Sequence, residues 1–425
     1  MTTFVFSDII CFKMKKLKII AILTVFTAIS QLCNAEQKKI TPIGNFQMLG
    51  GYSDSDKSDG LWGYNFSGSY APAVKLNDTQ HLIPLYSGIV ERMRQYITQE
   101  EGGRFYNDWQ LHNASVALRT RHSREWVSRF TGIATWSFLN ETQDEKFGKG
   151  LYDYRDFGFS FDLRQSLSVA ESQQHEYGWG FQYFRRTYPN YKSLISLASV
   201  TAPEVDEKDF DGIKLSWGFD EISKKGLSWD IKPSLLLKFF TDKKLITEDG
   251  TLDGDSKRKD YVLANNMGFD IPVLGSDRWV LSGDGNLTYN HSNLDLYDSR
   301  GTLILNDDVY TKDYYTFLSV SAYPYITYYH PIGKDKKFAL RGGYSFLYRH
   351  YPGRLAKEAG GAYTDSKQHD REHAVHLSAS YPITKELSWV TYFDYSWVKS
   401  NQKYEQFYTY NYNVYQVQSG ISIEF

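Results

Sequence analysis

The sequence predicts an all-β protein, a transmembrane antiparallel up-and-down β-barrel of about sixteen strands. Three observations favour this fold. Segments of about ten residues alternate apolar and polar side chains with the period of two that is typical of a strand. Short polar turns and long polar segments alternate between those strands. Aromatic residues make up 16% of the 425 residues, with 34 Tyr, 26 Phe and 10 Trp, which suits strands and membrane interfaces better than helical cores.

Charge and cysteine content exclude several classes of protein. The formal net charge is −2, so the chain lacks the strongly basic character of a nucleic-acid-binding protein. Its two cysteines, Cys11 and Cys33, both lie in a predicted leader. The remaining chain therefore has no disulfide and no cysteine-based catalyst or metal site. We expect no cofactor.

Residues 1–35 are predicted to be a signal peptide with an upstream extension, removed on export. Its basic region contains Lys15, Lys16 and Lys18. Residues 19–29 then form an apolar stretch that is too short to cross a bilayer as a helix. Cleavage after Ala35 leaves residues 36–425 as the barrel domain. Acylation at Cys33 is the alternative, and the large residue before that cysteine disfavours it.

The predicted strands follow one another as hairpins. A weak strand at 45–52 precedes a clear one at 61–76, and a turn at Asn77-Asp78 leads into a strand at 79–88. Six further hairpins are predicted across short turns, joining 109–120 to 126–139, 157–169 to 177–186, 213–219 to 227–239, 261–273 to 279–290, 314–328 to 338–348, and 375–381 to 387–397.

Long polar segments are predicted to connect the hairpins at the opposite end of the barrel. They cover residues 53–60, 89–108, 140–154, 189–211, 241–259, 291–312, 351–372 and 399–410. The run 89–97 has mixed periodicity. We expect it to be a surface loop or an extended strand end, with a constriction folded into the lumen as the alternative.

Tryptophans lie near the ends of several predicted strands. Indole rings are amphipathic and gather at headgroup level, so this placement favours a membrane girdle. Ordinary packing across a sheet is the alternative. The six tryptophans in such positions are Trp62, Trp126, Trp179, Trp229, Trp279 and Trp389.

The last strand, residues 415–425, has one apolar and one polar face and ends on an aromatic residue. It resembles the C-terminal strand of Gram-negative outer-membrane β-barrel proteins. The resemblance implies a location in the cell outer membrane, both termini in the periplasm, and an assembly signal that the barrel-assembly machinery reads. The residues of that signal would be Tyr415, Val417, Ile421, Ile423 and Phe425. No specific family is identified.

Charged residues on the polar phase of the strands are predicted to face the lumen, because on the lipid face they would cost about 2–4 kcal/mol near mid-membrane. The predicted lumen-lining residues are Arg129, Asp162, Arg164, Lys214, Asp230, Lys232, Lys238, Asp270, Asp284, Arg341, Arg349 and Asp394, with Glu424 at the end of the chain. Aromatic residues on the same phase are Tyr323, Tyr325, Tyr329 and Tyr392. A barrel this wide normally leaves a water channel. In the alternative, the charges only pair with one another and define no path.

These features favour a porin-like channel for passive diffusion of small hydrophilic solutes, with membrane lipid and lipopolysaccharide as its surroundings. A structural or adhesive surface protein with a closed lumen is the alternative, and a barrel enzyme is a third. His291 and Ser292 are adjacent on a strand, so they should point to opposite faces and not act as base and nucleophile. We therefore predict no catalytic site. The acidic run 54–59 lacks the closing glutamate of a calcium loop, so no metal site is predicted.

Overall fold

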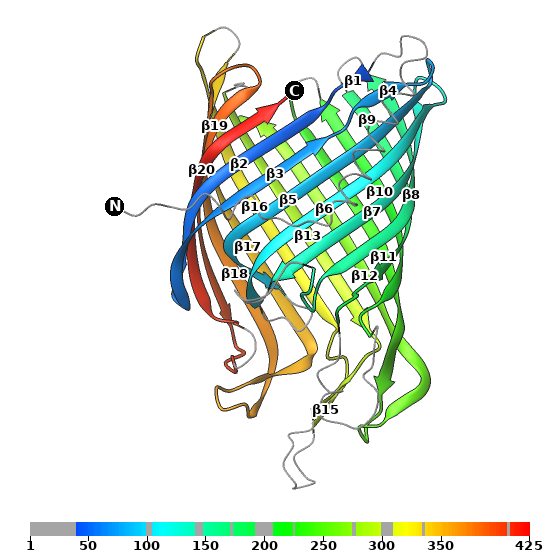
Figure 1. Cartoon of the computed structure of the whole chain (residues 1–425), viewed down its shortest axis with the longest axis vertical. Coiled ribbons are helices and arrows are strands. Elements are labelled where there is room, and N and C mark those ends of the chain that lie inside the picture. Colours follow the sequence, from blue (N-terminus) through cyan, green and yellow to red (C-terminus); the bar gives the residue numbers. More distant parts are fainter. Residues whose placement is uncertain are drawn as a thin grey trace.

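The computed structural model describes residues 40–98, 104–140, 148–170, 173–191, 207–223, 226–273, 278–298, 309–333, 336–405 and 409–425. Sixteen antiparallel strands form one closed barrel (Figure 1), which confirms the predicted fold class. Strand β20 (Tyr412–Glu424) closes the barrel by pairing with β2 (Gly44–Ser55). The predicted leader lies outside the described residues. Within the described residues, no helix is long and apolar enough to cross a membrane.

Each strand pairs with its neighbours in the chain, as an up-and-down barrel requires. The other barrel strands are β3 (Ser58–Tyr70), β5 (Gln80–Thr98), β6 (Arg104–Arg121), β7 (Trp126–Asn140), β8 (Tyr154–Ala170), β9 (Gln173–Thr187), β10 (Phe210–Ser223), β11 (Ser228–Ile246), β12 (Leu252–Pro272), β13 (Trp279–Ser292), β16 (Phe317–Pro331), β17 (Lys337–Lys357), β18 (Tyr363–Pro382) and β19 (Leu387–Ser400). Four short pieces complete the sheet structure: β1 (Ile40–Thr41), β4 (Ala73–Lys75), β14 (Leu296–Asp298) and β15 (Val309–Thr311).

The closing seam shows why the barrel has two different faces. On the outside, Phe46 pairs with Ile423 and Met48 with Ile421. Both side chains of β2 in these pairs are more than 40% exposed, because no protein covers them. Beyond the last ladder pair, Phe425 N donates to Gly44 O at 3.0 Å, and Gly44 N donates to Phe425 O at 2.8 Å. The chain terminus is therefore tied into the seam rather than frayed.

The outer face carries an apolar band bounded by aromatic rings. At the short-turn end, Trp126 stacks on Trp179 with ring centroids 5.9 Å apart, and Trp279 lies 4.5 Å from Tyr328. Trp62 lies at the other end of its strand, beside the β2–β3 turn, and is 77% exposed. On β19, the band runs from Trp389 to Trp397, about the 9–11 residues that a tilted strand needs to span a bilayer.

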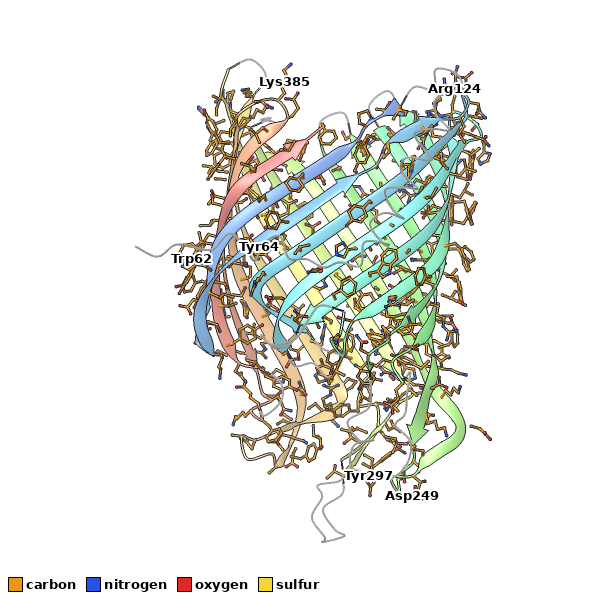
Figure 2. All side chains as sticks on the ribbon, viewed as in Figure 1. Trp62, Tyr64, Arg124, Asp249, Tyr297 and Lys385 are labelled. Carbon is orange, nitrogen blue, oxygen red and sulfur yellow. The ribbon has the colours of Figure 1, made fainter. Side chains whose placement is uncertain are left out.

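The two ends of the barrel differ in their connections. Arg124 and Lys385 lie in turns at one end, whereas Asp249 and Tyr297 lie at the other (Figure 2). The turn predicted at Asn77-Asp78 is present, since the Asn77 side chain accepts from the backbone of Thr79 and Gln80. The strand predicted at 61–76 is interrupted, because Pro72 has no N–H to donate to a ladder.

Four segments predicted as long loops are mostly strand, and those predictions were wrong. Strands β2 and β3 cover most of residues 53–60, β5 and β6 most of 89–108, β11 and β12 most of 241–259, and β17 and β18 most of 351–372. The run 89–97 belongs to β5, so it is the extended strand end that was expected and not the alternative, a constriction folded into the lumen. Beyond the membrane a strand has water on both faces, so it needs no apolar side. Its polar sequence then looks like a loop, while backbone pairing continues.

Candidate functional site: the inner wall of the barrel

The register of the strands defines which side chains line the lumen. Phe130 on β7 is 51% exposed on the outside, so its neighbours Arg129 and Thr131 point inward. Applied to every ladder, this alternation places all the predicted lumen-lining residues on the inner face. They are Arg129, Asp162, Arg164, Lys214, Asp230, Lys232, Lys238, Asp270, Asp284, Arg341, Arg349, Asp394 and Glu424.

Ion pairs run around the inner wall. Arg129 and Asp162 are direct cross-strand neighbours, with guanidinium and carboxylate 3.2 Å apart. Lys232 Nζ lies 2.9 Å from an Asp220 carboxylate oxygen and 3.1 Å from one of Asp230. These side chains keep between about a quarter and a half of their surface exposed. The pairs are therefore accessible to water in the lumen rather than sealed in a core.

Aromatic rings alternate with these charges on β16 and β17. The guanidinium of Arg341 lies 4.5 Å above the Tyr325 ring, and that of Arg349 lies 4.7 Å from the Phe317 ring. Tyr323 contacts Tyr325, with ring centroids 5.0 Å apart. This part of the wall combines cations with aromatic faces, an arrangement that holds both side chains in place.

A cavity of about 530 Å³ opens on the inner face of strands β11 to β18. The charged side chains in its lining are three carboxylates and one amine. The lining includes Asp230, Lys232, Asp284, Tyr323, Ser345 and Glu372. Its excess of carboxylates makes it better suited to neutral or cationic solutes than to anions.

Three side chains from three adjacent strands form a hydrogen-bonded chain at the edge of this cavity. The Ser345 hydroxyl on β17 lies 2.9 Å from His376 Nε2 on β18. His376 Nδ1 lies 2.5 Å from Asp394 Oδ1 on β19. We name Ser345, His376 and Asp394 the lumen triad. His376 and Asp394 are 29% and 34% exposed, so the triad faces the lumen water.

The inner wall of β5, β6 and β7 is different, because large aliphatic side chains point inward there. They are half-buried and come from three adjacent strands, where serine, threonine and asparagine separate them. We name this group the apolar sector, formed by Ile83, Leu85, Ile89, Leu111 and Ile133.

Sequence reasoning missed several residues of the inner wall. Glu176 and Asp220 point inward one residue beyond predicted strands, so extending the phase by one residue could have found them. Glu372 also points inward, but its segment was assigned to a loop. His376 also lies on the inward-facing phase of its strand. Its hydrogen-bond partners come from other strands, so no local sequence pattern predicts the triad. Arg354, which is 1% exposed, was missed because its segment was assigned to a loop. It donates to the carbonyl of Tyr314 at 3.0 Å.

The other sequence-derived candidates occupy separate places. His291 stacks on Tyr261 on the outer face, whereas Ser292 faces inward and is fully buried. Of the acidic run, Asp56 accepts hydrogen bonds from the backbone and side chain of Asn413. Among the described residues, no group of three or more His, Cys, Asp or Glu side chains is arranged to hold a metal ion.

The residues of the predicted assembly signal share the outer face of β20. They pair with residues of β19 on one side and of β2 on the other. The Tyr415 hydroxyl also donates to Asp54 Oδ2 at 3.3 Å. The signal residues in the strand are Tyr415, Val417, Ile421 and Ile423. Phe425 follows them, 57% exposed, with its ring 6.4 Å from that of Tyr70.

Comparison with known proteins adds likenesses of shape. No protein-family model and no curated protein matches the chain. The barrel is similar to OmpT, an outer membrane protein of Vibrio cholerae, with a TM-score of 0.44 and 11% identity over 91% of this chain and 99% of that one. It is also similar to Pseudomonas aeruginosa OccK8 (OprE), with a TM-score of 0.43 and 9% identity over 90% and 98%. For Salmonella typhi OmpF in complex with daunomycin, the TM-score is 0.41 and the identity 13% over 91% and 98%.

Proposed function

We propose that this protein is an outer-membrane channel for passive diffusion of small hydrophilic solutes. One observation carries the proposal: the inner wall is lined by water-accessible charges of both signs, while the outer wall is apolar. A closed barrel of this strand number is too wide for side chains to fill. The charged wall then provides a polar path for solutes. Its excess of carboxylates around the cavity favours neutral and cationic solutes.

The outer face supports placement in a membrane whose outer leaflet carries lipopolysaccharide. Exposed cations point outward just beyond the apolar band, toward the long-loop end. Arg371 and Lys399 are direct cross-strand neighbours there. Like charges directly opposite are destabilising in isolation, so a bound phosphate would relieve their repulsion. We name this group the outer cation ring, formed by Arg155, Arg185, Lys259, Arg371 and Lys399.

A planar-bilayer recording of the purified protein tests the channel. We expect stable steps of conductance, with cations more permeant than anions. A reversal potential under a salt gradient measures that preference. A bilayer that remains silent with folded protein inserted would contradict the proposal.

The second candidate is a surface protein with a closed lumen, and the extended hairpins favour it. Beyond the membrane, Arg258 pairs with Asp260 at 2.8 Å and lies between the rings of Phe240 and Tyr315. Such buried packing orders the outer end of the barrel, as a partner-binding surface requires. The silent bilayer described above is the result that favours this candidate.

We also propose that the barrel-assembly machinery reads the outer face of β20. Deletion of Phe425 removes the two backbone hydrogen bonds to Gly44 and the last apolar side chain of the seam. The truncated chain should stay in the periplasm and be degraded. Cell fractionation measures this, and a normal amount of truncated protein in the outer membrane would refute the role of Phe425.

A further inference from the structure

We propose that the lumen triad is a nucleophilic site that hydrolyses carboxylic esters entering the barrel. The inference goes beyond the channel function and rests on the triad's geometry. Ser345, His376 and Asp394 come from consecutive strands, and their side chains meet only because all three point inward. A serine, a histidine and a carboxylate joined in this order are the groups that activate a hydroxyl for attack on an acyl carbon.

The connections use the correct nitrogens of the imidazole. Asp394 accepts from Nδ1–H, which leaves Nε2 unprotonated and able to accept from the Ser345 hydroxyl. The distances of 2.5 and 2.9 Å are both within hydrogen-bond reach. His376 can therefore act as a general base toward Ser345, while Asp394 is a positioning residue that fixes the ring.

Tyr323 supplies a hydroxyl donor at the same place. Its ring lies edge-on to His376, with centroids 5.1 Å apart. The Tyr323 side chain covers Gly343. A Cβ atom added to Gly343 would lie 2.8 Å from Tyr323 Cε2 and 3.1 Å from the Tyr323 hydroxyl oxygen. Gly343 pairs with His376 and is the inward-facing residue next to Ser345 on β17, so the Tyr323 hydroxyl lies over the position adjacent to the nucleophile. Its O–H can donate to an oxyanion that forms there.

The reaction proceeds in two steps. The Ser345 oxygen attacks the ester carbonyl carbon while His376 Nε2 takes the hydroxyl proton, and the resulting oxyanion accepts a hydrogen bond from Tyr323. The bond to the alcohol oxygen then breaks, and His376 returns the proton to the departing alcohol. Water attacks the acyl group on Ser345 with His376 again as base. This releases the acid and restores the Ser345 hydroxyl, so ester and water become acid and alcohol.

The surroundings define the class of ester. The cavity beside Ser345 has room for a small molecule, and its carboxylates Asp230, Asp284 and Glu372 outnumber the amine of Lys232. Lys232 is itself paired with Asp220 and Asp230. Uncharged and cationic esters should therefore react faster than anionic ones of the same size.

The test uses the full chain folded in detergent micelles, with a fluorophosphonate probe that phosphonylates an activated serine and releases fluoride. We expect labelling at Ser345, located by peptide mass spectrometry. Ser345→Ala should abolish it, and His376→Gln should slow it by about 10²–10⁴-fold, the usual contribution of a general base. Asp394→Asn should also slow it, with partial recovery in Asp394→Glu. Hydrolysis of p-nitrophenyl butyrate should follow the same order.

Ser378→Ala is the matched control, because Ser378 faces the lumen from the same strand as His376. The probe should label this variant at the same rate as the unaltered chain. The mobility of unheated samples on electrophoresis shows that each variant is folded. The proposal would be overturned if the unaltered protein were labelled no faster than Ser345→Ala. It would also be overturned if folded His376→Gln were labelled as fast as the unaltered protein. Detergent removes any barrier to diffusion, so the outcome does not depend on whether the barrel conducts.

Discussion

The apolar sector and the lumen triad occupy different parts of one inner wall, and they differ sharply in chemistry. The apolar sector lies on β5 to β7, in the near wall of the barrel in Figure 1. The triad lies on β17 to β19. Strands β8 to β13 and β16 separate the two groups in one direction, and β20, β2 and β3 in the other. The wall at β5 to β7 therefore presents a group of aliphatic side chains, whereas the wall at the triad presents charges and hydrogen-bonding groups.

The difference shows what determines the orientation of a side chain in this barrel. On β11 the two faces contrast, with Leu235 outside and Lys232 inside, so lipid selects the orientation. On β7 both faces hold apolar residues, such as Phe130 and Ile133. There, Thr131 and Thr135 point inward and fix the phase together with the ladders to the neighbouring strands. An amphipathic lumen of this kind can receive solutes with both a polar and an apolar part.

The largest expected effect on stability distinguishes the residues that face lipid from those that face the lumen. Leu235→Arg should lower the free energy of unfolding by about 2–4 kcal/mol, because a guanidinium would enter the hydrocarbon. Ile133→Arg in the apolar sector should change it by less than about 1 kcal/mol, since the cation would reach lumen water. Denaturant titration of both variants folded into lipid vesicles provides the values.

Ser234→Arg is the control for the first of these variants, because Ser234 precedes Leu235 and points inward. It should cost little stability. If Ile133→Arg were as costly as Leu235→Arg, the apolar sector would face lipid. If Ser234→Arg were the more damaging of the β11 pair, the assigned faces would be reversed.

The closed barrel and the polar phase of its strands could be predicted from the sequence, because lipid imposes the same alternation on every spanning strand. For that reason, the inward orientation of Asp230 and Lys232 could be predicted from the alternation on β11. The extension of β17 and β18 past the membrane could not be predicted, since water on both faces removes the alternation. Nor could the triad, because Ser345, His376 and Asp394 meet only through the registers of two ladders. Those registers follow from long-range pairing rather than from local composition.

A second prediction compares glycines in the two parts of the barrel. Gly343→Ala should destabilise by about 1–3 kcal/mol, the usual effect of overpacking, because its Cβ would come within 2.8 Å of both Tyr323 and Tyr325. Gly132→Ala on β7 places its Cβ where nothing lies within 4 Å, so it should be neutral or stabilise slightly. Thermal unfolding of the folded barrels compares them. Equal destabilisation would contradict the packing described around Tyr323.

A third prediction asks whether both parts of the wall border the same water path. Ile133→Asp adds an anion in the apolar sector, and Arg341→Ala removes a cation near the triad. Each should shift the reversal potential toward greater cation preference, because ions pass both sides of one lumen. The measurement is a bilayer recording under a salt gradient. A shift with only one of the two variants would show that the other residue lies off the path.

The smallest expected effect concerns the ion pair between Arg129 and Asp162, which lies next to the apolar sector. Its guanidinium and carboxylate are 3.2 Å apart, with side chains 46% and 29% exposed. An exposed pair contributes about 0.2–1 kcal/mol, because water screens the attraction and ordering the side chains opposes it. A double-mutant cycle with Arg129→Ala, Asp162→Ala and both together should yield a coupling energy in that range. It should fall as salt is raised, since ions enter the lumen and screen the pair. A coupling energy of several kcal/mol, unchanged by salt, would mean that lumen water does not reach Arg129, and the inner wall of β7 would then be closed rather than part of a solute path.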